Sequence, residues 1–193
     1  MNTFPFLALL FRQRYITRWS LMRSSYPETL SDHSFETAAV AHMLAIIGNT
    51  RFGRSYDADR IAMTALYHDA GEVYTGDLPT PIKYHSAELR DSYKKLEDTA
   101  CEKLITKLPE DVRDEYRTYL MPDDENTLKL VKAADKLCAL IKCMEEERSG
   151  SHEFTAALGS TKAAIDNLSK QLPEVEVFVN ELLPAFEMTI DEL

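Results

Sequence analysis

The sequence predicts an all-α fold, and three observations support that expectation. Apolar residues recur at helical spacing through most of the 193 residues, and no pair of alternating apolar and polar segments is joined by a hairpin turn. Four of the eight prolines, Pro109, Pro122, Pro173 and Pro184, mark breaks between these periodic segments or starts of them. The length suits one domain with a sizeable core, so residues 1–193 are expected to form a single helical domain.

The expected helices cover, approximately, residues 4–15, 31–47, 58–68, 86–107, 110–120, 124–148, 152–171 and 173–183. Ser31 or Asp32 can cap the second helix, because a short side-chain oxygen accepts from free backbone N–H groups. Gly48-Asn49 can end it. Residues 16–30 lack a sustained period and are expected to form a loop. A second loop, at 71–81, is marked by glycines and prolines.

Net charge, apolar runs and cysteine content limit which partners and which cellular compartment we expect for this protein. The formal net charge of -10 argues against a nucleic-acid polymer as partner, since such binders normally present a basic face. The sequence contains no run of about 18 apolar residues, the length needed to cross a membrane. Near the N-terminus Arg12 and Arg14 follow the apolar residues instead of preceding them, unlike a signal peptide. The three cysteines form no C-x-x-C pair and are interpreted as reduced thiols of a cytoplasmic protein.

Four residues could together bind a metal ion. His68 and Asp69 offer an imidazole nitrogen and a carboxylate oxygen from neighbouring positions, and divalent metals accept both donor types. His33 and Asp135 are the candidates for the remaining ligands. Taken alone, His33 would more often be a surface or capping residue. Asp135 lies in an apolar helical segment, so it either faces solvent or is buried with a partner, because an unpaired buried charge is costly.

Glu72 is the candidate proton-transfer group. It follows His68 by four residues and Asp69 by three, which brings the three side chains to one side if a helix continues through Gly71. Such a carboxylate could act on a metal-bound water without being a ligand. The alternative is a solvated glutamate at a helix end.

The other histidines are poorer candidates. His42 lies nine positions after His33, so helical geometry places it on the opposite face of the same helix, and we expect a structural role. His85 and His152 have no ligand-like neighbours, although His85 follows the proline-containing loop.

The order His33, then His68-Asp69, then Asp135 resembles the HD-domain phosphohydrolase superfamily. The match is closer to one branch, the small metal-dependent 5′-deoxynucleotidases, and it covers most of the chain. The matching segments are residues 18–23, 30–34, 67–72, 75–84 and 131–135. The family usually has Glu where this chain has Asp32, and often Ser or another small residue at the position of Gly71. Neither change alters a ligand.

The resemblance implies an HD-type helical bundle whose N-terminal and C-terminal helices pack on the HD core. It implies one divalent cation held by His33, His68, Asp69 and Asp135, a ligand set that suits Zn²⁺, Co²⁺, Mn²⁺ or Fe²⁺. It also implies hydrolysis of deoxynucleoside 5′-monophosphates to deoxynucleoside and phosphate. A metal-bound water would be the nucleophile, and Glu72 would be the general acid and base.

The same resemblance assigns the substrate contacts. Arg18, which outside this motif would be read as a surface residue, orients the phosphate through its planar fork. Trp19, the only Trp and otherwise a core candidate, excludes a ribose 2′-hydroxyl by bulk. Asp77 could accept a hydrogen bond from the sugar 3′-hydroxyl. The expected substrate-binding residues are Arg18, Trp19, Asp69, Asp77, Leu78, Pro79, Thr80 and Asp135. A homodimer is expected because close relatives are dimers.

Two other functions remain open. Related small HD proteins release triphosphate from deoxynucleoside triphosphates, which should require more cationic residues than the Arg18, Arg23 and Lys83 found near the motifs. The monophosphate is therefore favoured, although Lys83 could equally be solvated. A non-catalytic nucleotide-binding helical module would keep the ligands for structural reasons, and the presence of Glu72 argues against it.

Overall fold

The protein is almost entirely helical. The computed structural model describes residues 3–83 and 85–193, the side chain of Thr80 excepted. Apart from one isolated bridge between Thr17 and Thr29, these described residues contain no β-structure. The all-α prediction is confirmed. No helix among them is both long and apolar enough to cross a lipid bilayer.

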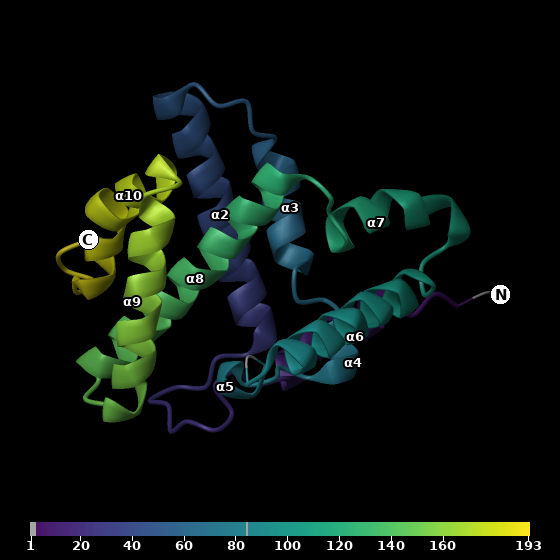
Figure 1. Ribbon diagram of the computed structural model, residues 1–193, viewed down its shortest axis with the longest axis horizontal. Helices are drawn as coiled ribbons and strands as arrows, with labels where there is room; N and C mark the ends of the chain where they lie inside the picture. Colours follow the sequence, from purple (N-terminus) through teal and green to yellow (C-terminus); the bar gives the residue numbers. More distant parts are fainter. Residues whose placement is uncertain (1–2, 84) are drawn as a thin grey trace.

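Two long helices, α2 (Leu30–Phe52) and α8 (Glu125–Arg148), cross at the centre of the molecule, and α3 (Ala58–Tyr67) packs against both (Figure 1). Their apolar faces form the main core, in which side chains such as Leu44 and Leu137 are fully buried. Burial of this apolar surface is the main force that holds the three helices together. This crossing brings the start of α2 close to the middle of α8.

A second, smaller core joins the N-terminal segment to α6 (Ala87–Ile105) and α7 (Arg113–Leu120). Phe6, from α1 (Phe6–Leu10), is buried there and packs edge-on against Tyr116 at a centroid distance of 5.1 Å. The remaining elements are the 3₁₀ helices Phe11–Tyr15, Glu110–Val112 and His152–Phe154, the helices α4 (Glu72–Thr75), α5 (Thr80–Lys83), α9 (Thr155–Ser169) and α10 (Pro173–Val177), a π turn at Phe178–Leu182 and a 3₁₀ helix at Leu183–Glu187.

Helix α2 begins one residue before the expected caps. Thr29 is the N-cap: its side chain accepts from the backbone N–H of Asp32, and the Asp32 carboxylate accepts from the backbone N–H of Thr29 at 3.0 Å. This reciprocal pair is a capping box with Asp in the usual Glu position. The expectation that Ser31 or Asp32 caps the helix was therefore wrong, because Thr29 is the N-cap and Asp32 is the third residue of the helix.

The expected stop at Gly48-Asn49 was also wrong, because α2 continues to Phe52 and ends on Gly53 with a positive φ of 63°. Gly48 has a packing role instead. A Cβ at this position would lie 2.6 Å from Tyr56 Cε2 and 2.9 Å from Glu174 Oε1. Gly48 therefore allows Tyr56 and Glu174 to pack closely against α2. In the sequence, a glycine needed for such packing cannot be told from a glycine that ends a helix.

We expect Gly48→Ala to lower the free energy of unfolding by about 1–3 kcal/mol, because the added methyl group overpacks a closed site. Gly159→Ala is the matched control: Gly159 lies in the interior of α9 with nothing within 4 Å of a Cβ, and alanine should stabilise there by about 0.5–1 kcal/mol. Urea denaturation of both variants measures the effect. Two changes of the same sign would contradict this role of Gly48.

Both ends of the chain are less regular than expected. The segment 4–15 contains α1 followed by a 3₁₀ helix, and 173–183 contains α10, the π turn and the start of a 3₁₀ helix that runs to Glu187. Pro184 explains the second change, because it has no N–H to continue an α-helical hydrogen-bond pattern.

Candidate active site

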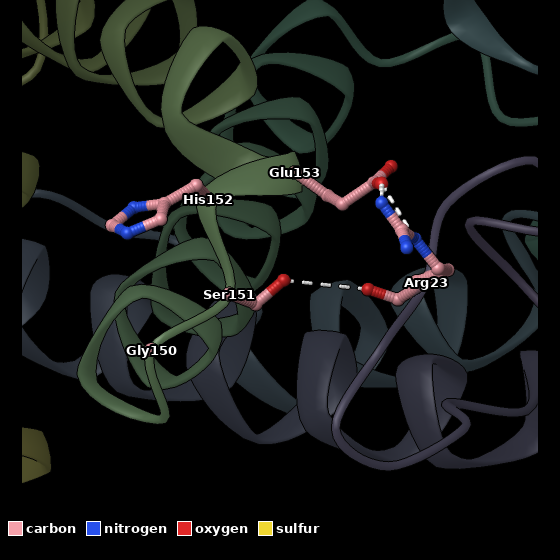
Figure 2. A pocket seen from close by; sticks show the side chains of 5 residues that line it. All are labelled: Arg23, Gly150, Ser151, His152 and Glu153. Carbon is pink, nitrogen blue, oxygen red and sulfur yellow. Dashed lines mark hydrogen bonds and ion pairs between the residues drawn. The ribbon is translucent and has the colours of Figure 1, made fainter.

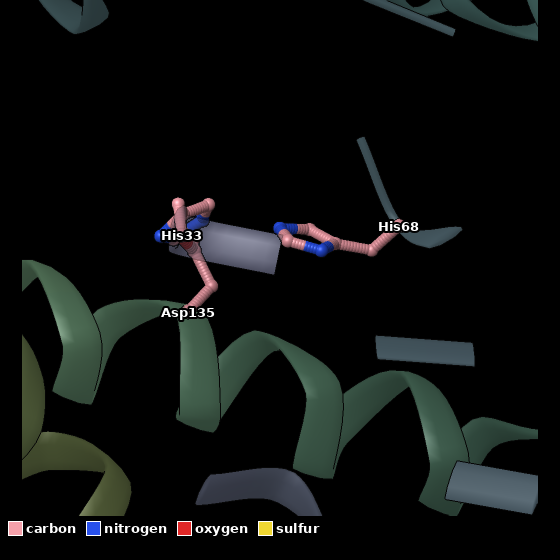
Figure 3. A group of neighbouring side chains, drawn as sticks. All are labelled: His33, His68 and Asp135. Atoms are coloured by element: carbon pink, nitrogen blue, oxygen red, sulfur yellow. The ribbon is translucent and has the colours of Figure 1, made fainter. Parts of the chain in front are cut away.

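Three structural segments bring the predicted metal ligands together. His33 is fully buried in the first turn of α2, His68 and Asp69 follow the end of α3, and Asp135 lies midway along α8. The Nε2 atom of His33 is 3.3 Å from Asp135 Oδ1 and 3.7 Å from Asp69 Oδ2. One donor atom from each of His33, His68 and Asp135 lies within 4.8 Å of the others, and Figure 3 shows these side chains converging. Asp135 thus faces the other donors instead of pointing away from them.

The link between α3 and α4 is a tight turn, not a continuous helix. Helix α3 ends at Tyr67, and residues 68–71 form turns before α4 begins at Glu72, whose N–H donates to Asp69 O at 3.0 Å. A Cβ on Gly71 would lie 3.1 Å from Cys101 Sγ, so this turn lies directly against α6. The assumption that a helix continues through Gly71 was wrong, yet the turn still buries Glu72.

The tautomer of His68 suits metal binding. His68 Nδ1 is 2.6 Å from the carbonyl oxygen of Ala65, so Nδ1 carries the proton and Nε2 keeps its lone pair. Nε2 is buried and has no hydrogen-bond partner within the described residues, although Asp69 Oδ2 is 3.0 Å away. Donor atoms around an ion with bonds of about 2.1 Å lie roughly 3–4 Å apart. The residues present therefore fit a divalent cation.

The electrostatics of the site favour added positive charge. Burial, together with the nearby charge of Asp69, raises the pKa of Glu72 to about 10. Burial by itself would lower the pKa of His33, but hydrogen bonding to Asp135 and Glu28 outweighs it and raises the pKa to about 9. Both groups therefore hold a proton at neutral pH. A divalent cation bound at this site would offset the negative charge of Asp69, Glu72 and Asp135. It would also displace the proton from His33.

Arg18 and Trp19 lie on the loop that leads into α2, and neither is a freely solvated surface residue. The Nη1 atom of Arg18 is 3.7 Å from Asp69 Oδ2, and its Nε is 3.4 Å from Glu28 Oε1. The indole Nε1–H of Trp19 donates to Glu28 Oε2 at 2.6 Å, and its ring packs against Phe154 at a centroid distance of 5.3 Å. This loop therefore brings a cation and an aromatic ring to the edge of the metal-ligand cluster.

Glu28 is a residue that the sequence did not identify. It is buried and contacts Arg18, Trp19 and His33. No apolar periodicity surrounds it, and its neighbours were expected to form a loop, so nothing in the pattern indicated a buried carboxylate. Its position just before the cap of the helix that carries His33 is the only sequence signal.

The predicted substrate loop is held against α6. Tyr93 Oη–H donates to Gly76 O at 3.3 Å, and Lys83 Nζ lies 2.6 Å from Glu97 Oε1. Lys83 is therefore paired, not solvated. Burial raises the pKa of Asp77, opposed in part by the charge of Arg18. Leu78 and Pro79 are half-buried, whereas the side chain of Thr80 and all of Tyr84 lie outside the described residues.

The other histidines do not join the cluster. His42 is 44% exposed at its side chain and lies 3.7 Å from Asp59, in keeping with a role away from the site. His85 is exposed. His152 borders a shallow surface hollow, where Figure 2 shows its ring turned away from the Arg23–Glu153 ion pair.

Comparison with known proteins identifies the family. Residues 5–186 match the family model described as 5′-deoxynucleotidase YfbR-like. The chain is 44% identical over 195 residues to a 5′-deoxynucleotidase of Vibrio parahaemolyticus, with both chains fully covered. An HD-domain phosphohydrolase from Listeria innocua shares the fold, with a TM-score of 0.82, 22% identity, and coverage of 94% of this chain and 87% of that one.

A second solved structure has the same fold. It is the cyanophage S-2L HD phosphohydrolase DatZ, bound to dA and one catalytic Zn²⁺ ion, with a TM-score of 0.60, 20% identity and 96% coverage of both chains. The identity to both structures is low, so they establish the HD fold alone, and the sequence matches establish the branch. This chain belongs to the family of YfbR-like 5′-deoxynucleotidases.

Proposed function

We propose that this protein hydrolyses deoxynucleoside 5′-monophosphates to a deoxynucleoside and inorganic phosphate, with one divalent cation bound by His33, His68, Asp69 and Asp135. The main support is the close approach of these donors beside the guanidinium of Arg18, which supplies local positive charge in a chain of net charge -10. The relatives named 5′-deoxynucleotidases support the same reaction.

Each group has a distinct task. A bound cation supplies Lewis acidity toward a phosphate oxygen and makes a bound water more acidic. Arg18 binds and orients the phosphate, since its fork can contact two oxygens. The positive charge of a bound cation would favour the carboxylate form of Glu72, and in that form Glu72 takes a proton from the attacking water as the new P–O bond forms. It returns that proton to the sugar 5′-oxygen as the bond from phosphorus to that oxygen breaks. Asp77 and its loop bind the sugar.

A product panel tests the proposal. Purified protein is incubated with mono- and triphosphates of deoxy- and ribonucleosides, each with Zn²⁺, Co²⁺, Mn²⁺ or Fe²⁺. We expect inorganic phosphate from the deoxynucleoside monophosphates, and the most active metal identifies the preferred cofactor. Release of triphosphate from the deoxynucleoside triphosphates would instead support the triphosphohydrolase alternative. No release from any nucleotide would exclude catalysis of this class.

Trp19 should set the sugar preference. We expect Trp19→Ala to reduce the deoxy-to-ribo ratio of kcat/KM by about tenfold or more, because a removed steric block admits the 2′-hydroxyl. Trp19→Phe is the control, since it keeps a ring in the same place. Kinetics with one deoxynucleotide and its ribo counterpart give the ratio. An equal loss on both sugars would limit Trp19 to a packing role.

We also infer that the chain forms a homodimer. Several large apolar side chains on one side of α2 face away from the core: Phe35 is 70% exposed, Met43 41% and Ile46 39%. Their spacing is helical, so together they form a stripe that a second copy could cover. Light scattering after gel filtration should give twice the 22.0 kDa of the chain. A mass of one chain would contradict the inference.

A further inference from the structure

Glu28 lies between three groups that the proposed function uses. Its side chain is only 5% exposed. Oε1 is 3.4 Å from Arg18 Nε and 3.5 Å from His33 Nδ1, and Oε2 accepts from Trp19 Nε1–H at 2.6 Å. We propose that Glu28 is a positioning residue, which couples the metal ligand His33 to the phosphate-binding Arg18 and the sugar-contacting Trp19. This inference rests on the proposed function for the roles of those three residues.

The first coupling is to the metal ligand. Nε2 faces Asp69 and Asp135, and Nδ1 faces Glu28. When a cation displaces the proton from Nε2, a carboxylate facing Nδ1 holds the remaining imidazole proton there, so that the Nε2 lone pair is available to the cation. The other polar neighbour of the ring is Thr37, whose hydroxyl is 3.4 Å from one nitrogen and 3.5 Å from the other, and so favours neither orientation. Among the described residues, Glu28 is therefore the carboxylate that orients the ring from the Nδ1 side, opposite the proposed ligands Asp69 and Asp135.

The second coupling is to the indole. Trp19 has a φ of 57°, and among the described residues it is the one non-glycine residue with positive φ. This conformation is costly for an aromatic residue and persists when its surroundings enforce it. The hydrogen bond to Glu28 is short and charge-assisted, and the ring of Phe154 packs against the indole at a centroid distance of 5.3 Å. Both hold the ring in place.

The third coupling is through the backbone. Arg18 N–H donates to Glu28 O at 2.9 Å, next to the bridge between Thr17 and Thr29. The two ends of the loop are thus paired, and the Glu28 carboxylate also lies 3.4 Å from Arg18 Nε. A shift of Glu28 therefore moves Arg18 with it.

The loop has anchors that do not involve the Glu28 carboxylate. Ser25 N–H donates to Glu146 at 2.7 Å, and the buried Lys142 Nζ donates to Tyr26 O at 2.9 Å. The loop should therefore stay folded on α8 when only the charge of Glu28 is removed. Glu28→Gln is the appropriate variant, because glutamine keeps the shape but cannot accept from all three donors at once.

The test measures Zn²⁺ affinity by chelator competition, which requires no turnover. We expect Glu28→Gln to bind Zn²⁺ about 10–100-fold more weakly, the usual effect of losing a carboxylate behind a ligating histidine. At saturating Zn²⁺ it should also raise KM and lower the deoxy-to-ribo ratio. Glu174→Gln is the matched control. Glu174 is fully buried against Gly48, and Gly48 lies fifteen residues along α2 from His33. Replacing Glu174 should therefore leave Zn²⁺ affinity unchanged.

A Zn²⁺ affinity and a deoxy-to-ribo ratio within twofold of wild type in Glu28→Gln would overturn the proposal. Should that variant fail to fold, the wild-type protein still decides, because Trp19 is the only Trp and gives a single indole N–H resonance. Zn²⁺ binding should shift this resonance through Glu28, and an unchanged resonance at saturation would overturn the proposal. If wild type binds Zn²⁺ but hydrolyses no nucleotide, the proposed function fails while the coupling of Glu28 remains measurable.

Discussion

We expect Glu72→Gln to lower the rate of phosphate release by about 10²–10⁴-fold, the usual contribution of a positioned proton-transfer group. Glu72 is buried, and its Oε2 has no hydrogen-bond partner within the described residues. Glutamine keeps the shape of the side chain but cannot take a proton from water. Single-turnover phosphate release measures the rate, and calorimetry should show that substrate and cation still bind.

The control for Glu72 is Glu174→Gln, because Glu174 is also a buried glutamate whose Oε2 has no hydrogen-bond partner in the part of the chain that the structure describes. Glu174 lies against Gly48, fifteen residues along α2 from His33. It should retain wild-type turnover per folded molecule. If Glu72→Gln also kept turnover within a few-fold of wild type, Glu72 would have no part in proton transfer. Loss of cation binding in Glu72→Gln would make it a ligand instead.

The same substitution should change how stability depends on pH in protein treated with a chelator. The pKa of Glu72 is about 10 in the folded protein against an ordinary value of 4.5. Between these values the unfolded chain releases a proton that the folded protein retains, so the free energy of unfolding falls as pH rises. Glutamine removes this dependence. Glu72→Gln should therefore exceed wild type in Tm at pH 8, with a smaller difference at pH 5.

For a chain of this length, about 1 kcal/mol corresponds to roughly 2–4 °C in Tm, so differential scanning fluorimetry can resolve the change. A difference in Tm that is the same at pH 5 and pH 8 would show that Glu72 is not responsible for the pH dependence. Saturation with Zn²⁺ should reduce the difference at pH 8, because added positive charge favours the carboxylate form.

Local signals were sufficient to predict some helices. Helix α3 was expected at 58–68 and α8 at 124–148, and their observed bounds differ from these by one residue each. Both begin after an aspartate N-cap, Asp57 and Asp124, whose side chains accept from free backbone N–H groups. The end of α2 was predicted wrongly at Gly48, because the sequence does not distinguish a glycine that ends a helix from one that allows close packing.

In the candidate site, too, some residues could be predicted from local sequence and others depend on tertiary packing. His33, His68, Asp69 and Asp135 could be named as candidate donors from their residue types, but only the resemblance to HD-domain proteins grouped all four as one ligand set. Glu28 could not, because its burial depends on three partners that meet only after the loop has folded onto α2 and α8. The positive φ of Trp19 likewise follows from tertiary contacts, not from local preference.

We expect His33→Ala to lower phosphate release by about 10³-fold or more, because a metal contributes several kcal/mol of charge stabilisation and one of its proposed ligands is lost. His42→Ala is the matched control, being the same residue type on the same helix. Its side chain lies half-exposed beside Asp59, so both turnover and Zn²⁺ binding should remain. Chelator treatment of wild type should abolish activity, and added Zn²⁺ or Co²⁺ should restore it.

The His33 and His42 pair separates metal binding from general damage to α2. Both substitutions remove an imidazole from the same helix, but only His33 is fully buried and faces Asp69, Asp135 and Glu28. If metal ligation is the role of His33, Zn²⁺ should raise the Tm of wild type and of His42→Ala, but not of His33→Ala. Equal stabilisation of both variants by Zn²⁺ would mean that the cation binds without His33, and the proposed site would have to be redrawn.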